Sequence, residues 1–133
     1  MRFLLDTNTC IAYLNRRTSS VEEHVKRLLP ADIALCSVVR SELVFGAHKS
    51  AKVSENLARL EVFFQPFRSL ALDDRAADVA GRIRAEIEKL GTPIGPNDLL
   101  IGAIALAHGL TLVTNNSGEF TRVPGLLLED WTA

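Results

Sequence analysis

The stretch FLLDTNTCIAYL (residues 3–14) passes from an apolar run through Asp6 into small polar residues and then a second apolar segment. A short apolar run that meets a capping type of residue is typical of a buried strand followed directly by a helix. We therefore expect a strand over residues 2–5 and a helix over residues 7–15. Asp6 is then either the cap of that helix or, if other acids converge on it, a metal ligand.

The same alternation continues along the chain. We expect further strands over residues 33–36, 69–72, 110–113 and 126–128, with helices between them. The helix that begins at Pro96 is apolar or glycine on every side from Leu99 to Ala107, which is typical of a fully buried helix. Strands that alternate with helices predict an α/β domain of three layers, α/β/α, around a short, mainly parallel sheet of four or five strands.

The composition argues against several classes of protein. The 133 residues suit one domain, and 47% of them are hydrophobic, which is enough for a core. The net charge of −1 argues against a strong general affinity for nucleic acid, so phosphate binding would need local clusters of Arg and Lys. The two cysteines form no CxxC pair and the three histidines are scattered, which argues against a zinc site and favours a reducing, cytoplasmic location. No secretory signal or apolar run of about 18 residues is present, so we expect no membrane segment.

Two more acids stand where acids are unusual. On a helix over residues 37–49, Glu42 falls on the apolar arc between Val38 and Val39. Asp98 lies in the first turn of the buried helix that begins at Pro96. Each has an ordinary explanation: Glu42 as part of a salt bridge, and Asp98 as a charge that favours the positive end of a helix by about 0.3–1 kcal/mol.

Asp6, Glu42 and Asp98 together are harder to explain in this way. If they converge, two carboxylates about 4 Å apart repel by roughly 4 kcal/mol at an effective dielectric near 20. Either one of them binds a proton or a cation lies between them. Ligation by oxygen alone selects a hard ion such as Mg²⁺ or Mn²⁺, and that ion commonly also binds substrate phosphate. The three acids therefore indicate phosphodiester or phosphoryl chemistry.

Three stretches, residues 3–14, 37–50 and 91–131, resemble the PIN-domain ribonucleases, and among these the VapC toxins of type II VapBC toxin–antitoxin systems. The resemblance covers almost the whole chain, in the same order, and implies a single PIN domain over residues 1–133. It also implies that Asp6, Glu42 and Asp98 hold Mg²⁺ or Mn²⁺ for the hydrolysis of RNA.

The fourth acid of that family often follows the last core strand in a Thr-x-Asp pattern. This chain has Thr114-Asn115-Asn116 instead, so Asn116, or Glu119 three residues later, would take that place as a further catalytic residue. Thr7, Asn8 and Thr114 are candidate hydrogen-bond partners behind the metal ligands. Turn and cap chemistry explains those three residues equally well.

The resemblance also implies partners. We expect a homodimer, a cognate VapB antitoxin that forms a heterotetramer or larger complex with it, and operator DNA bound only through that antitoxin. The expected substrate is RNA, with the anticodon loop of initiator tRNA as the specific guess, and the candidate RNA-binding residues are Arg16, Arg17, Lys49 and Arg122. Apolar side chains of the short helices are read first as core and second as a groove for the antitoxin peptide; these are Val21, Leu57, Leu60, Phe63 and Phe64.

Two rival functions remain open at this point. A phosphohydrolase of the haloacid-dehalogenase type also begins with a strand and a catalytic aspartate. That family requires Asp-x-Asp-x-Thr, whereas residues 6–10 here read DTNTC. A non-catalytic module for RNA binding or dimerisation is the other rival, because Asn116 replaces an acid.

Overall fold

A computed structural model describes residues 1–15 and 19–132, with the side chain of Ser19 excepted. Within these ranges the chain forms one five-stranded sheet in the order β3-β2-β1-β4-β5. All four strand pairings are parallel, which confirms the expected α/β class. The strands are β1 (Phe3–Leu5), β2 (Ile33–Cys36), β3 (Arg68–Leu70), β4 (Thr111–Val113) and β5 (Leu128–Glu129).

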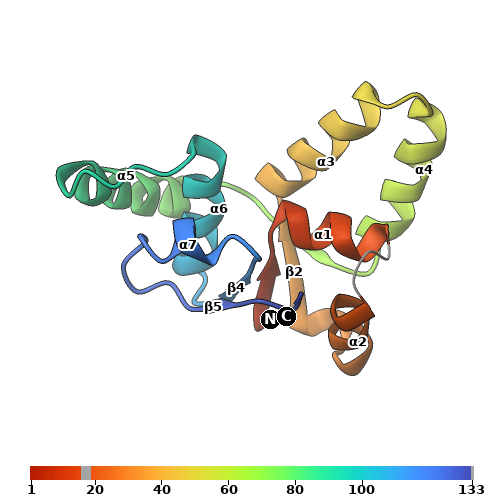
Figure 1. The fold of residues 1–133 in the computed structure, drawn as a ribbon, viewed down its shortest axis with the longest axis horizontal. Coiled ribbons are helices and arrows are strands. Elements are labelled where there is room, and N and C mark those ends of the chain that lie inside the picture. The colour runs from red at the N-terminus through yellow and green to blue at the C-terminus, as the bar shows by residue number, and fades with distance from the viewer. Residues whose placement is uncertain (16–18, 133) are drawn as a thin grey trace.

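Helices cover both faces of the sheet, so the domain has the three expected layers. Figure 1 shows α1 to α4 on one side and α5 to α7 on the other. The first group is α1 (Thr7–Leu14), α2 (Ser19–Arg27), α3 (Ser37–Lys49) and α4 (Val53–Phe64). The second is α5 (Asp74–Lys89), α6 (Pro96–Ala107) and α7 (Ser117–Phe120), and a 3-10 turn, η1 (Pro30–Asp32), precedes β2.

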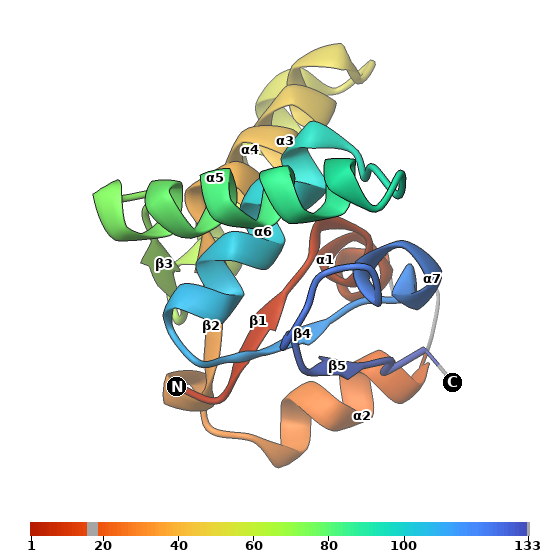
Figure 2. The same cartoon turned by 90° about the vertical axis from the view of Figure 1, so that its left-hand side faces the viewer.

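The central strand β1 explains why the sheet forms here. Its three residues are apolar and buried, and it pairs with β2 on one side and β4 on the other. A strand that is covered on both faces needs an uninterrupted apolar run of this kind. In Figure 2, α1 starts where β1 ends, so Asp6 lies at the carboxyl edge of the sheet, where ligands gather in parallel α/β folds.

A second, smaller core joins α5 to α6. Its buried residues come from both helices and from the segment after α7: Ala80, Ile83, Ile87, Leu99, Ala103 and Val123. Asp73 caps α5 by accepting a hydrogen bond from the Ala76 N–H (2.9 Å), and Gly91 follows its last turn with a positive φ of 71°. These contacts fix α6, which carries Asp98 in its first turn.

Some expected boundaries were wrong. Strand β3 covers Arg68–Leu70 and not residues 69–72, and β5 covers Leu128–Glu129 and not residues 126–128. Both are short edge strands with exposed residues, so the apolar pattern marks their ends poorly. Helix α7 was not expected, because four residues that include a glycine carry no helical pattern. No helix in the described part of the chain has the length and apolar character needed to cross a membrane.

Candidate active site

Asp6 is a buried carboxylate at the end of β1. Its side chain is 4% exposed and accepts a hydrogen bond from the Thr9 N–H (2.8 Å), so it caps α1. The Asp6 N–H donates to the Val113 carbonyl (3.0 Å), which ties the residue to β4. Burial raises the pKa of Asp6, while hydrogen bonding from Thr114 and Thr9 acts in the opposite direction. Asp6 therefore does cap α1, but its carboxylate is buried and its charged form is disfavoured.

Glu42 lies on α3 beside this acid. It is half-buried, and the Thr7 hydroxyl donates to its Oε1 over 2.6 Å. Thr7 is the first residue of α1 and directly follows Asp6. Asp6 and the hydroxyl that orients Glu42 therefore lie on the same turn of the chain. Within residues 1–15 and 19–132, no ion pair joins Asp6, Glu42 or Asp98 to a lysine or arginine. The salt-bridge explanation of Glu42 is therefore not supported there.

Asp98, in the first turn of α6, is the acid most affected by its surroundings. Its pKa is raised from 3.8 to about 6, chiefly by burial and further by the negative charges of Glu119, Glu42 and Asp6. Those three charges act on Asp98 because all four carboxylates lie in one region. The structure thus brings Asp6, Glu42 and Asp98 into the same neighbourhood from three separate elements, namely the end of β1, α3 and α6.

The chemistry of these donors fits a hard divalent cation. They are oxygen ligands only, two of them have raised pKa values, and a cation among them would offset the repulsion. In the described part of the chain, no three His, Cys, Asp or Glu side chains stand close enough to hold one ion as they are. Mg²⁺ commonly uses one or two carboxylates and keeps several waters. Shared ligation of one ion by all three acids stays a prediction.

Side chains after β4 complete the region. The Asn116 N–H donates to the hydroxyl of buried Thr114 (2.9 Å), and the Asn116 side-chain amide donates to Glu119 Oε2 (3.1 Å). Glu119 Oε1 accepts the Gly95 N–H (2.6 Å). Hydrogen bonds from Gly95 and Asn116 lower the pKa of Glu119. Whether Asn116 or Glu119 replaces the fourth acid stays a prediction.

The expected supporting residues fall in different places. Thr7 contacts Glu42, and Thr114 acts on Asp6, whereas Asn8 is exposed. Thr9 was missed. It is buried, donates its N–H to Asp6, and its hydroxyl donates to the Val113 carbonyl (3.1 Å). Its place three residues after a capping aspartate is the signal that would have identified it.

Comparison with known proteins identifies the family of this chain. The PIN domain family model matches residues 3–126. The tRNA(fMet)-specific endonuclease VapC of Salmonella typhimurium is 40% identical over 131 residues, which is 98% of each chain. The enzyme of the same name from Shigella flexneri is 42% identical over 132 residues, 99% of each chain. This chain belongs to the VapC group of the PIN-domain family.

Solved structures of VapC-group complexes have the same fold. DNA-bound VapBC from Salmonella typhimurium matches with a TM-score of 0.94 and 40% identity over 98% of both chains. VapBC2 from Rickettsia felis, bound to a DNA fragment from its promoter, matches with a TM-score of 0.91 and 37% identity. It covers 98% of this chain and 99% of its own.

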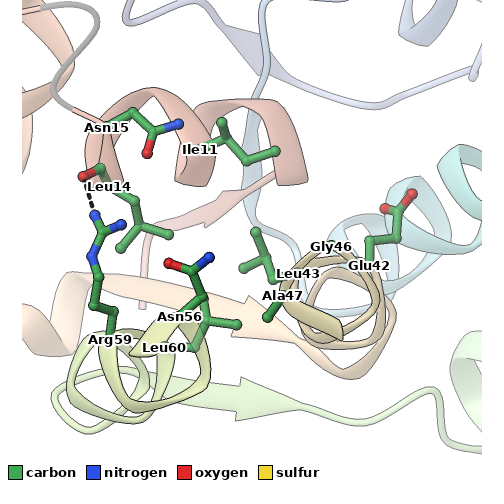
Figure 3. Close-up of a pocket in the computed structure, with 10 residues that line it drawn as sticks. All are labelled: Ile11, Leu14, Asn15, Glu42, Leu43, Gly46, Ala47, Asn56, Arg59 and Leu60. Carbon is green, nitrogen blue, oxygen red and sulfur yellow. Dashed lines mark hydrogen bonds between the residues drawn. The ribbon is translucent and has the colours of Figure 1, made fainter. Parts of the chain in front are cut away.

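In this VapC-group chain, a groove of about 240 Å³ runs between α1, α3 and α4, and Glu42 is one of its lining residues. Figure 3 shows Glu42 at one end and Arg59 at the other, where the Arg59 guanidinium donates to the Leu14 carbonyl (2.8 Å). Of the apolar residues expected as core or groove, Val21, Leu60 and Phe63 are buried, while Leu57 and Phe64 are half-buried. Leu60 also lines the groove.

The expected RNA-binding residues are spread over the surface. Lys49 is exposed at the end of α3, with its ammonium 5.3 Å from the centre of the Phe45 ring. Arg122 is exposed after α7, and its guanidinium donates to the Pro93 carbonyl (2.8 Å). Arg16 and Arg17 lie outside the described residues. Contact of any of the four with RNA stays a prediction.

Proposed function

We propose that this chain is the toxin of a type II toxin–antitoxin pair and acts as a metal-dependent endoribonuclease. Residues 1–133 work as one PIN domain in the cytoplasm of a bacterium, and Asp6, Glu42 and Asp98 hold Mg²⁺ or Mn²⁺. The main support is electrostatic: burial and three neighbouring carboxylates raise the pKa of Asp98 to about 6. A bound divalent cation would offset that repulsion. Membership of the VapC group supports RNA as the substrate.

Each acid has its own task in this proposal. Asp6 is held rigidly by Thr9 and by its backbone bond to β4, so it fixes the position of the site. Glu42 is oriented by the Thr7 hydroxyl, and Asp98 approaches from the opposite layer of the fold. A bound Mg²⁺ or Mn²⁺ supplies a water of lowered pKa and stabilises charge on the phosphate.

The specific RNA is the finer part of the proposal. Two relatives that match over nearly the full length are named for tRNA(fMet), and we propose the anticodon loop of initiator tRNA as the target here. The low net charge means that affinity must come from local cations, for which Lys49, Arg122, Arg16 and Arg17 are the candidates. A homodimer would place two such sets on one surface.

A cognate VapB antitoxin completes the system. We propose that it assembles with the dimer as a heterotetramer or larger complex, and that DNA is bound only through the antitoxin. The groove that ends at Glu42 supports inhibition by a peptide laid from Arg59 toward the acids. Such a peptide would cover Glu42 directly.

The test is cleavage by protein purified free of antitoxin. Initiator tRNA, elongator methionine tRNA and total RNA are each incubated with Mg²⁺ or Mn²⁺ and with EDTA. We expect cuts in the initiator anticodon loop that need the metal and disappear in Asp6→Asn and Asp98→Asn. Cutting that persists in both variants would reject the site. Metal-dependent cutting of other RNAs would keep the activity and reject the tRNA target.

A further inference from the structure

Two side chains from the segment after β4 form hydrogen bonds with the loop that precedes α6. Glu119 Oε1 accepts the Gly95 N–H (2.6 Å), and the Arg122 guanidinium donates to the Pro93 carbonyl (2.8 Å). Pro93 and Gly95 are only two residues apart, so the two contacts act on one stretch of the loop. They join segments that are 24 and 29 residues apart in sequence. The segment around α7 thus holds the start of α6 at two points.

The bond between Glu119 and Gly95 matters because Asp98 lies in the first turn of the same helix. Gly95 is the N-cap of α6 and Pro96 is its first residue, so Asp98 is the third residue of the helix. A Glu or Gln at that third position commonly turns back to accept the N–H of the N-cap residue, in the arrangement called a capping box, and Asp98 carries the same carboxylate on a side chain one methylene shorter. Glu119 already occupies the Gly95 N–H. Asp98 is thereby kept from the bond that its place in the helix would favour.

The geometry around Gly95 shows that the two acids compete at close range. A Cβ at Gly95 would lie 3.5 Å from Glu119 Oε1 and 3.8 Å from Asp98 Oδ2. Both carboxylates therefore flank the same small residue, yet only Glu119 bonds its N–H. Glu119 Oε2 is also engaged, by the Asn116 side-chain amide (3.1 Å). Both Glu119 oxygens thus have protein donors, in contrast to a carboxylate left free to bind a metal.

We propose that Glu119 is a positioning residue that caps α6 in place of Asp98 and so leaves the Asp98 carboxylate free to bind a metal together with Asp6 and Glu42. Arg122 supports it by fixing the carbonyl of Pro93. This assignment rests on the proposed function, since Asp98 matters only if it binds the metal. It differs from a role for Glu119 as the fourth acid, because the property required is a hydrogen-bond acceptor and not a negative charge.

The experiment compares Glu119→Ala with Glu119→Gln in antitoxin-free protein. The side-chain carbonyl of glutamine still accepts the Gly95 N–H, whereas alanine accepts nothing. Mn²⁺ affinity is measured by electron paramagnetic resonance of the free ion, and RNA cleavage is measured separately. Glu88→Ala is the matched control, because it removes an exposed acid that is paired with Arg84 on α5, away from this loop. Circular dichroism shows that each variant folds.

We expect Glu119→Ala to weaken Mn²⁺ binding and cleavage by about tenfold or more, because Asp98 turns back to the Gly95 N–H. A crystal structure of that variant should show an Asp98 oxygen within hydrogen-bond distance of Gly95 N. Glu119→Gln and Glu88→Ala should stay within about twofold of the unchanged protein.

Equal losses in Glu119→Ala and Glu119→Gln would overturn the proposal, because charge and not capping would then be required. An unchanged Mn²⁺ affinity in Glu119→Ala would overturn it as well. If the unchanged protein binds Mn²⁺ but cuts no RNA, the proposed activity fails, while the two Mn²⁺ affinities still decide the role of Glu119. If the protein binds no Mn²⁺ at all, both proposals are rejected.

Discussion

Replacement of Asp98 by asparagine should make the metal-free protein more stable while it removes activity. The pKa of Asp98 is raised from 3.8 to about 6, so the folded chain holds this proton more firmly than the unfolded chain does. Folding therefore loses stability as the pH rises from about 4 to about 6, and the full penalty is present above that window. Asparagine has a similar shape and carries no charge, so it avoids the penalty.

The size of the effect follows from the same shift. A pKa change from 3.8 to about 6 corresponds to about 3 kcal/mol. Asp98 is half-buried, and water screens part of the repulsion from Glu119, Glu42 and Asp6. We therefore expect Asp98→Asn to raise the free energy of unfolding by about 1–2 kcal/mol at pH 7.5 and by almost nothing at pH 4.

Urea unfolding in EDTA at pH 4, 5, 6 and 7.5 measures this difference, with protein concentration held fixed because a dimer would couple stability to it. Asp78→Asn is the control, since Asp78 is an exposed aspartate on α5. Added Mn²⁺ should stabilise the unchanged protein more than the Asp98→Asn variant. A variant that is less stable at pH 7.5, or a gain of the same size at pH 4, would refute the electrostatic reasoning.

Three other changes test separate parts of the structure. Thr7→Val removes the hydroxyl 2.6 Å from Glu42, so the Mg²⁺ concentration for half-maximal cleavage should rise about tenfold and Thr7→Ser should restore it; an unchanged Mg²⁺ requirement would contradict this role. Trp131→Ala removes a side chain that is 1% exposed and should cost about 3–5 kcal/mol in urea unfolding, and a loss below 1 kcal/mol would mean that the site repacks. Gly46→Leu fills the groove at a position where a Cβ meets nothing within 4 Å, so calorimetry should show weaker antitoxin binding while Gly81→Leu, equally open on α5, leaves it unchanged; equal affinities in both would place the antitoxin peptide elsewhere.

Much of this fold could be predicted because its central elements carry local signals. The apolar run of β1 ends at a capping aspartate, and α6 begins with a proline and is apolar on every side, so both elements were predicted correctly. Asp6, Glu42 and Asp98 stand out as candidates because each carboxylate interrupts an apolar pattern. An acid in such a place needs a compensating partner, and this physical requirement can be read without knowledge of the fold.

The features that were missed depend on contacts between distant segments. Glu119 was considered only as a substitute acid, because the sequence gives no sign that a residue 24 positions after Gly95 bonds its N–H. Helix α7 and strand β5 are too short for their periodicity to show. Nor does the sequence show that Cys36 is the N-cap of α3, or that the Ser37 hydroxyl accepts the Leu72 N–H (3.3 Å).

The order of strands divides this molecule in a simple way. Residues 3–70 build β3, β2 and β1 side by side, and residues 111–129 add β4 and β5 beyond β1. The proposed metal ligands come from both blocks, with Asp6 and Glu42 from the first and Asp98 from the helix that leads into the second. A protease cut between β3 and α5 would leave two pieces that each keep their own strands but hold an incomplete set of acids. Each piece alone would therefore lack part of the proposed metal site.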